Sequence, residues 1–277
     1  PLAWSLLPVL LLLSIGGGWL IARDSFLPLE RITEAAGSIS DGDDLSARLD
    51  LRRGPREMRR LARTFDGMFA RLETSFLSKK QFTADASHEL RTPVAVILAE
   101  CDRARRKAET KEDFLASINV IEQQGNKMNT LIEQLLSLTR IQQGTEKYPL
   151  RVCDLSGFVD ACCDEFVPAD ERGMTLETDI EPGVAAAYNP SLLSRAMFNL
   201  MQNAYKYGRE GGNIRVSLCR ENGCAVISVK DDGPGIPKAE QEKIWQRFYR
   251  CDTSRAEGGT GLGLSLVREI ALVHHAR

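Results

Sequence analysis

The chain has 277 residues, with 36 lysines and arginines against 38 aspartates and glutamates and a formal net charge of −2. This length allows about one to three domains, and the near-neutral balance lacks the basic excess of a general nucleic-acid coat, so we expect no nucleic-acid partner. Hydrophobic residues make up 43% and charged residues 27%, which excludes global disorder. The seven cysteines form neither a Cys-x-x-Cys pair nor a cluster with histidine. This excludes an extracellular disulfide scaffold and predicts reduced thiols without a zinc site.

Residues 1–22 carry no charge and are mostly apolar. As a helix rising about 1.5 Å per residue they would extend roughly 33 Å, enough for a hydrocarbon core of about 30 Å. We interpret them as a transmembrane helix. The alternatives are a signal peptide, which typically begins with basic residues, and a buried core helix. Arg23 and Arg31 follow the span, which predicts a membrane anchor with the residues after about 22 in the cytoplasm. Because the sequence begins with Pro1 rather than methionine, we expect further residues before it.

Residues 23–78 hold two amphipathic helical patterns, at 29–39 and 58–76, joined by a breaker cluster at 41–44. Two short helices of this kind cannot bury their apolar stripes alone. They need partner helices, most simply from a second copy of the chain. An ordinary helical hairpin is the alternative interpretation.

A helical segment then contains Ser-His-Glu-Leu-Arg-Thr-Pro at 87–93. At about 100° per residue, His88 and Thr92 lie about 40° apart on the face opposite the apolar stripe of this helix. A lone histidine is usually a satisfied core or surface residue, but this placement excludes the core. An exposed imidazole beside the carboxylate of Glu89 can act as a nucleophile, because the acid fixes the tautomer and accepts the proton.

A second apolar stripe follows on a predicted helix at about 112–140. The two helices together carry more apolar surface than one hairpin can bury, so a dimeric four-helix bundle is the natural solution. From about residue 145 the pattern changes to mixed helices and strands, which continue to the end of the sequence.

A helix is predicted from Asn189, as its N-cap, to Gly208, which closes it. Asn199, Asn203 and Lys206 form a polar stripe that borders its apolar face. Two carboxamides and an ammonium in this arrangement suit a metal-bound polyphosphate, with Asn203 offering an oxygen to Mg²⁺. A solvated helix face is the alternative.

Two strands, at 214–218 and 224–229, flank an Asn-Gly hairpin turn at 222–223. The second strand leads to Asp231 beside glycines, where a carboxylate can accept a hydrogen bond from an adenine amino group. Later, the glycine-rich segment 258–265 opens a helix, so its backbone N–H groups can face phosphate. It fits neither the P-loop nor the Rossmann fingerprint, and the motifs of Ser/Thr/Tyr kinases are absent.

In chain order, the motifs at 87–93, 199–207, 231–237, 245–250 and 258–265 resemble the H, N, G1, F and G2 boxes of a bacterial sensor histidine kinase. The resemblance covers nearly the whole chain and implies a multidomain fold, helical first and then α+β. The implied parts are a transmembrane helix at 1–22, a HAMP-like linker at 23–78, a dimerisation and phosphoacceptor domain at 79–145 and a Bergerat-type (GHKL) ATP-binding sandwich at 146–277.

The resemblance also implies chemistry. ATP and Mg²⁺ would bind the C-terminal domain of a homodimer, and His88 would take a phosphoryl group and pass it to an aspartate of a response regulator, with phosphatase activity toward that partner. The implied catalytic residues are His88, Glu89 and Thr92. The implied nucleotide-site residues, with Asn203 as the Mg²⁺ ligand, are Asn199, Asn203, Lys206, Tyr207, Asp231, Gly233, Gly235, Phe248, Arg255, Gly259, Gly261, Leu262 and Gly263. Residues 238–258 would form a lid over the nucleotide.

The family's ATPase domain normally continues past the helix at 262–275 into further strands, whereas this sequence stops at Arg277. We therefore expect a sandwich that lacks its last strands, and the alternative function is a catalytically inactive, membrane-anchored dimeric scaffold. A GHKL ATPase of the chaperone or topoisomerase type would share the nucleotide motifs but does not need the exposed motif at 87–93, so this class is disfavoured. A chemoreceptor-like rod would lack the motifs after residue 190.

Overall fold

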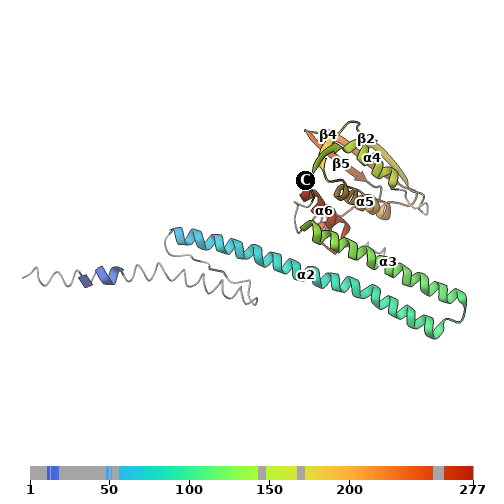
Figure 1. Ribbon diagram of the computed structural model, residues 1–277, viewed down its shortest axis with the longest axis horizontal. Coiled ribbons are helices and arrows are strands. Elements are labelled where there is room, and N and C mark those ends of the chain that lie inside the picture. The colour runs from blue at the N-terminus through green and yellow to red at the C-terminus, as the bar shows by residue number, and fades with distance from the viewer. Residues whose placement is uncertain are drawn as a thin grey trace, which may run out of the picture. The chain divides into compact units, whose positions relative to one another are not determined.

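The computed structural model describes residues 11–12, 14–18, 48–49, 51, 56–142, 148–166, 172–251 and 259–276 (Figure 1). The chain divides into two compact units, Pro1–Ala84 and Asp85–Arg277. Across the described ranges, no helix is both long enough and apolar enough to cross a bilayer. Most of the span predicted at 1–22 lies outside these ranges, as do the first predicted helix and the breaker cluster of the linker.

In the first unit, a short connector is tied to the first half of helix α2 (Arg56–Lys107). The backbone N–H of Leu49 donates to Oδ1 of Asp66 at 2.7 Å, and Arg48 forms an ion pair with Glu73. The side chain of Leu49 is buried, and so are two side chains on the same helix, Ala62 and Phe69. Arg48 and Leu49 therefore lie against α2 through one buried side chain and two polar contacts.

Helix α2 is continuous over 52 residues, which differs from the two separate helices expected on either side of residue 78. The reason is local: residues 73–82 contain neither glycine nor proline, so nothing in the backbone chemistry interrupts the helix there. The helix also runs through Pro93, whose side chain is buried.

The second unit begins with the rest of α2 and helix α3 (Lys111–Gln142), which run antiparallel (Figure 1). A capping box starts α3: Asp113 accepts from the backbone N–H of Thr110 at 3.1 Å, and the Thr110 hydroxyl accepts from the N–H of Asp113 at 3.2 Å. Arg103 on α2 donates to the Ser117 hydroxyl on α3 at 3.0 Å.

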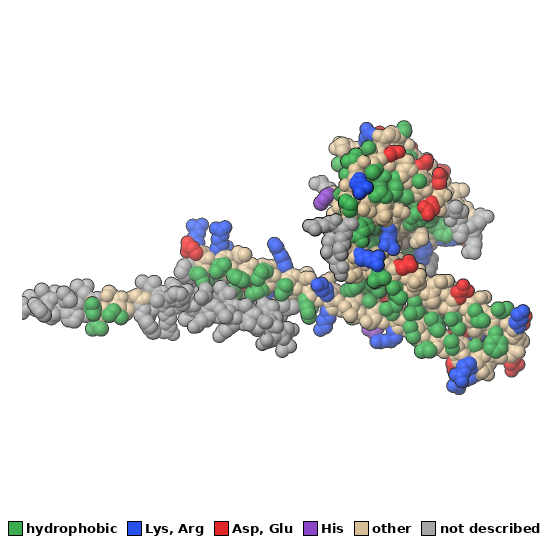
Figure 2. Space-filling view, viewed as in Figure 1, with side chains coloured by type: hydrophobic (Ala, Val, Ile, Leu, Met, Phe, Trp, Pro, Cys, Tyr) green, Lys and Arg blue, Asp and Glu red, His purple; other side chains and the backbone are tan. Residues whose placement is uncertain are grey.

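This hairpin leaves much apolar surface exposed, as Figure 2 shows. The large apolar side chains that remain exposed on it are Val94, Leu98, Phe114, Leu115, Ile118, Ile132 and Leu136. Several of them belong to the stripes expected to form a bundle core. Their exposure in a single chain agrees with the prediction that the hairpin needs partner helices.

The rest of the second unit is an α/β body. Strand β1 (Arg151–Asp154) pairs antiparallel with β3 (Ala185–Tyr188); β4 (Asn213–Glu221) pairs parallel with β2 (Thr175–Ile180) and antiparallel with β5 (Cys224–Lys230). The helices are α4 (Leu155–Glu165), α5 (Pro190–Tyr207), the short η3 (Lys243–Trp245) and α6 (Gly263–Val273). Helices α4 and α5 share one core with the strands, which includes Val159, Met197, Met201, Val216 and Leu218.

Local sequence signals set two of these elements, and both predictions are confirmed. The Asn189 side chain accepts from the N–H of Leu192 at 3.2 Å and caps α5, and Gly208 ends that helix. In the hairpin, Asn222 (φ 51°) and Gly223 (φ 81°) both take positive φ, as a two-residue turn of this kind requires.

A second core joins α3 to the α/β body. Its buried members are Leu131, Leu138 and Ile141 of α3 with Leu192, Ala196, Leu262, Leu266, Ile270 and Val273 of α5 and α6. The predicted α3 stripe is therefore divided: Leu131 packs in this core, while Ile118 and Ile132 are exposed.

Candidate active site

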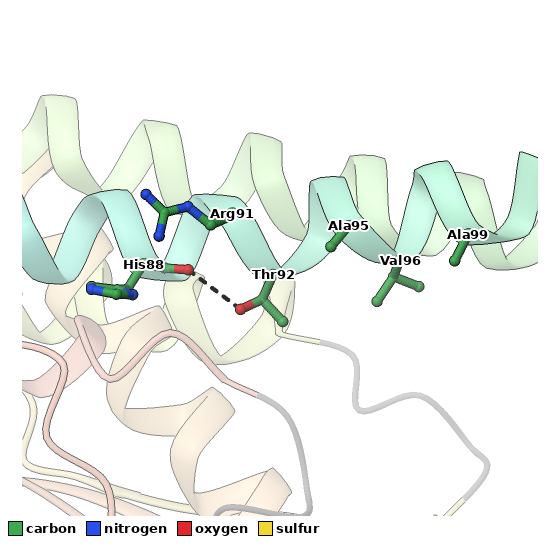
Figure 3. A pocket seen from close by; sticks show the side chains of 6 residues that line it. All are labelled: His88, Arg91, Thr92, Ala95, Val96 and Ala99. Atoms are coloured by element: carbon green, nitrogen blue, oxygen red, sulfur yellow. Dashed lines mark hydrogen bonds between the residues drawn. The ribbon is translucent and has the colours of Figure 1, made fainter.

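His88 and Thr92 stand on one exposed face of α2, as the helical geometry predicts. The Thr92 hydroxyl donates to the carbonyl oxygen of His88 at 3.3 Å (Figure 3). Both residues line an open hollow whose other lining residues are Arg91, Ala95, Val96 and Ala99. A phosphate-sized group can therefore approach the imidazole from solvent, and the small side chains beyond Thr92 leave room on the same surface for a partner.

The helix is locally weakened at this point. Proline has no N–H, so Pro93 cannot form the helical hydrogen bond to the carbonyl of Glu89. The Glu89 side chain is half-buried, next in sequence to the exposed imidazole of His88. The candidate residues His88 and Glu89 thus lie about one turn before Pro93, the only proline of α2.

Helix α5 places the predicted polar stripe at the border of the core. Asn199, Asn203 and Lys206 are all half-buried, beside the fully buried Met197 and Met201. The Asn199 amide donates to the carbonyl of residue 195 at 2.7 Å, which leaves its oxygen available. The ammonium of Lys206 is the cation of the stripe.

Both glycine-rich loops lie against this end of α5. A Cβ atom added at Gly263 would lie 2.8 Å from Oδ1 of Asn199, and one added at Gly259 would lie 2.8 Å from Nζ of Lys206. A Cβ at Gly233 would overlap the carbonyl oxygen of Tyr207. Gly233 meets fixed backbone and Gly259 has φ 150°, so both positions favour glycine. The loops that contain Gly233, Gly259 and Gly263 thus meet α5 around the polar stripe.

The loop after β5 presents two adjacent carboxylates with different surroundings. Oδ1 of Asp231 accepts from the N–H of Gly233 at 2.9 Å, and the exposed side chain keeps a second oxygen for a ligand. Asp232 instead accepts from the N–H groups of Arg209 and Asn213, each at 3.2 Å. The bond from Arg209 is the main cause that lowers the pKa of Asp232 below its usual value of 3.8. Asp231 is the candidate ligand group, and Asp232 holds the loop that follows α5.

Phe248 and Gly261 form a tight backbone pair. The N–H of Phe248 donates to the carbonyl of Gly261 at 2.9 Å, and both residues have positive φ, 60° and 67°. Positive φ is costly for a bulky residue such as phenylalanine, and its ring packs against the core shared by α3, α5 and α6. The pair thus joins the segment before residue 252 to the start of α6.

Three predicted site residues lie apart from these contacts. Leu262 is completely buried in the core of α6, so only its backbone can face a ligand, and its N–H donates to the Thr260 hydroxyl at 3.3 Å. Gly235 has φ 73° in the exposed loop after β5. Arg255 lies outside the described residues.

Sequence reasoning missed two polar contributors to this site. Asp232 looks like a duplicate of Asp231 in sequence, and only the fold shows that its carboxylate binds two backbone N–H groups. Gln134 on α3 accepts from the Thr260 hydroxyl at 2.6 Å. No local pattern marks a single glutamine on a long helix as a partner of a loop 126 residues away.

Three families of protein domain match the chain in order. Residues 20–74 match the HAMP domain, and residues 78–144 match the His Kinase A (phospho-acceptor) domain. Residues 188–277 match the histidine kinase-, DNA gyrase B-, and HSP90-like ATPases.

Two sensor proteins are similar to most of this chain. The sensor histidine kinase RppB of Synechocystis sp. is 37% identical over 205 residues, covering 72% of this chain and 45% of RppB. The sensor protein CutS of Streptomyces coelicolor is 34% identical over 263 residues, covering 93% of this chain and 62% of CutS. The chain thus spans less than two thirds of either relative.

A solved structure of the histidine kinase ThkA in complex with the response regulator TrrA has the same fold. It superposes with a TM-score of 0.59 at 23% identity, covering 74% of this chain and 57% of that chain.

Proposed function

Because the chain belongs to the sensor histidine kinases of two-component systems, we propose that it is an ATP-dependent protein-histidine kinase that is phosphorylated on His88. The phosphoryl group then passes to an aspartate of a response regulator. We further propose that residues 1–22 anchor the chain in the inner membrane, that it acts as a homodimer, and that it also dephosphorylates its partner.

The observation that carries this proposal is the meeting of both glycine loops with the polar stripe of α5. The carboxamide oxygens of Asn199 and Asn203 and the ammonium of Lys206 suit a Mg²⁺-bound triphosphate, because an oxygen can bind the metal ion and the cation can bind phosphate. Gly259 and Gly263 approach the side chains of Lys206 and Asn199, and Gly233 approaches the backbone of Tyr207, so closely that an added Cβ atom would collide. The exposed carboxylate of Asp231 supplies the acceptor for an adenine amino group.

The residues therefore fit ATP with Mg²⁺. Asn203 would hold the metal ion, which when bound neutralises charge on the phosphate oxygens. Lys206 adds positive charge, and the N–H groups at the start of α6 face the phosphates from a helix N-terminus. As in phosphoryl transfer generally, these residues act by positioning and charge neutralisation rather than by covalent chemistry.

His88 provides the nucleophile. Its unprotonated ring nitrogen forms a bond to the γ-phosphorus while the bond from that phosphorus to the bridging oxygen breaks and ADP leaves. Glu89 takes the proton from the other ring nitrogen, which leaves an uncharged imidazole ring that carries the negatively charged phosphoryl group. The P–N bond then breaks as the phosphoryl group passes to the aspartate of the response regulator. The exposed position of His88 supports this role because both partners must reach it.

Thr92 and the exposed apolar faces support the finer proposals. Thr92 lines the same hollow as His88, where its hydroxyl can orient a water toward a bound receiver domain. The exposed side chains of α2 and α3, such as Leu98 and Ile118, supply a surface for a second copy of the hairpin. A signal would arrive as a change in packing of the HAMP-like helices.

The full chain, purified in detergent because of its apolar first 22 residues, tests the proposal by incubation with γ-³²P-ATP and Mg²⁺. We expect label that is stable in alkali and lost in acid, the behaviour of a phosphohistidine. It should be absent from His88→Gln, which lacks the nucleophile, and from Asn203→Asp, which alters the metal ligand.

Gln81→Ala is a matched control on the same helix, because Gln81 is exposed and lies outside the hollow at His88. Label that persists in His88→Gln would overturn the assignment of the phosphoacceptor. An unlabelled wild-type chain that still forms dimers would instead favour the inactive scaffold.

A further inference from the structure

Arg172 lies just before β2, far in sequence from every motif of the nucleotide site. Its guanidinium donates to the carbonyl oxygens of Tyr205 and of Lys206, the latter at 2.7 Å, and to that of Gly208 at 2.9 Å. It also lies over the ring of Tyr205, 5.7 Å from the ring centroid. The side chain is half-buried, so these bonds form in partly desolvated surroundings.

These contacts complete the end of α5. The last four carbonyls of a helix have no partner within the helix. In α5, the carbonyl of Ala204 accepts from the N–H of Gly208 at 2.8 Å, and Arg172 satisfies the next two carbonyls. The fourth, that of Tyr207, faces Gly233 in the loop after β5. A cation at this end also matches the negative pole of the helix dipole.

The turn that Arg172 holds is the turn that carries the site. Lys206 and Tyr207 project from it and Asn203 directly precedes it, and the Lys206 ammonium donates to the Tyr207 hydroxyl at 3.2 Å. The backbone of Arg172 is fixed as well, because its carbonyl accepts from the N–H of Gly211 at 2.8 Å. The guanidinium therefore fixes the backbone that carries Lys206, the proposed phosphate-binding cation, and that directly follows Asn203, the proposed metal ligand.

We propose that Arg172 is a positioning residue of the nucleotide site, one that sets affinity for the Mg²⁺–nucleotide by fixing the last turn of α5 without touching the ligand. This inference rests on the nucleotide binding proposed above. A guanidinium is required because its planar fork reaches three carbonyls at once, whereas an ammonium is a point charge that cannot span them.

The test measures the affinity of the full chain, in detergent, for a fluorescent trinitrophenyl-ATP with Mg²⁺. Arg172→Gln should bind the analogue with about tenfold lower affinity. This is the size of loss seen when a residue that orients the ligands of a metal site, without binding the metal itself, is removed. Arg172→Lys keeps the charge but not the fork and should recover part of that loss. Arg215→Gln is the matched control, because Arg215 is an exposed arginine of the same body, paired with Glu177 on the opposite strand.

Thermal unfolding of each variant separates positioning from simple stabilisation. All affinities are measured at a temperature where circular dichroism shows the variant folded. If Arg172→Gln does not fold, the affinity of Arg172→Lys is compared with that of the wild type instead. If the Arg172 variants melt earlier but bind the analogue as tightly as wild type, Arg172 is only a structural cap and the inference is wrong. If wild type itself does not bind, the proposed nucleotide site is wrong and this inference fails with it.

Discussion

The hydroxyl of Thr260 donates a hydrogen bond of 2.6 Å to Oε1 of Gln134, a residue 126 positions earlier in the chain. The same hydroxyl oxygen accepts from the N–H of Leu262 at 3.3 Å. Gln134 stands on α3 between residues of the core that α3 shares with α6, so one side chain of the helical hairpin binds a glycine loop at the proposed nucleotide site. At the end of α3, Gln142 makes a second such contact, donating to Glu269 of α6 at 3.1 Å.

Replacing Gln134 by alanine should therefore loosen loop 259–263. The half-buried Thr260 hydroxyl would lose its acceptor, which costs about 1 kcal/mol and raises the population of the open loop roughly fivefold. Hydrogen exchange of the peptide that contains Gly261 and Gly263, followed by mass spectrometry, measures this opening.

Gln134→Glu keeps an oxygen acceptor and should exchange at the wild-type rate. Gln123→Ala removes an exposed glutamine of the same helix and controls for any general effect on α3. Equal exchange in Gln134→Ala and Gln123→Ala would show that the contact with Thr260 contributes nothing.

Asp232 should make the α/β body sensitive to acid. Its pKa is lowered in the folded protein, first by the N–H of Arg209 and then by that of Asn213. A carboxylate with a lowered folded pKa stabilises the fold fully above its unfolded value of about 3.8, and this stabilisation is lost as pH falls below that value. Asp232→Asn should therefore melt earlier than wild type at pH 7, and the difference should shrink below about pH 4.

Melting curves of both proteins from pH 3 to pH 7 provide the measurement. Asp160→Asn, at an exposed position of α4, is the control for loss of a surface charge. A difference between Asp232→Asn and wild type that stays constant across this range would contradict the linkage.

His275 occupies a position that favours glycine. Its φ is 54°, and α6 ends in a Schellman motif: the N–H of His275 donates to the carbonyl of Leu272 at 3.2 Å, and that of Ala276 to the carbonyl of Ala271 at 2.9 Å. His275→Gly should relieve the left-handed strain and stabilise the body by about 0.5–1 kcal/mol. Thermal unfolding checks this.

A glycine introduced in the interior of α6 should have the opposite effect. Arg268→Gly, at an exposed interior position, should destabilise by about 1 kcal/mol because glycine disfavours a helix. If His275→Gly is as destabilising as Arg268→Gly, the strain at residue 275 is not real.

The sequence predicted well those features whose chemistry is local. Asn189 and Gly208 bound α5 because an N-cap side chain and a closing glycine act within a few residues. The turn at Asn222 and Gly223 is equally local. The helical angle between His88 and Thr92 follows from geometry alone.

Other features depend on contacts that local chemistry does not specify. Arg172 binds backbone carbonyls more than 30 residues away, and every residue has such a carbonyl, so no residue pattern marks the target. The continuous helix α2 was missed because two domain patterns meet within it without a breaker. The division of the α3 stripe between two packing surfaces depends on α6, whose position on α3 only the fold determines.

Gly261 should be the least replaceable glycine of the site. It combines φ 67° with a backbone neighbour, since a Cβ atom there would lie 2.7 Å from the carbonyl carbon of Phe248. Gly261→Ala must either break the hydrogen bond from Phe248 or shift the start of α6, so it should lose more than about 1 kcal/mol. For a body of this size, each kcal/mol lowers the melting temperature by roughly 2–4 °C.

Gly125→Ala is the matched control, because Gly125 is an exposed glycine of α3 with open space at its Cβ position. It should raise stability by about 1 kcal/mol through helix propensity. The two alanine substitutions are thus expected to shift the melting temperature in opposite directions. Shifts of the same sign would show that the contact between Gly261 and Phe248 does not constrain the loop.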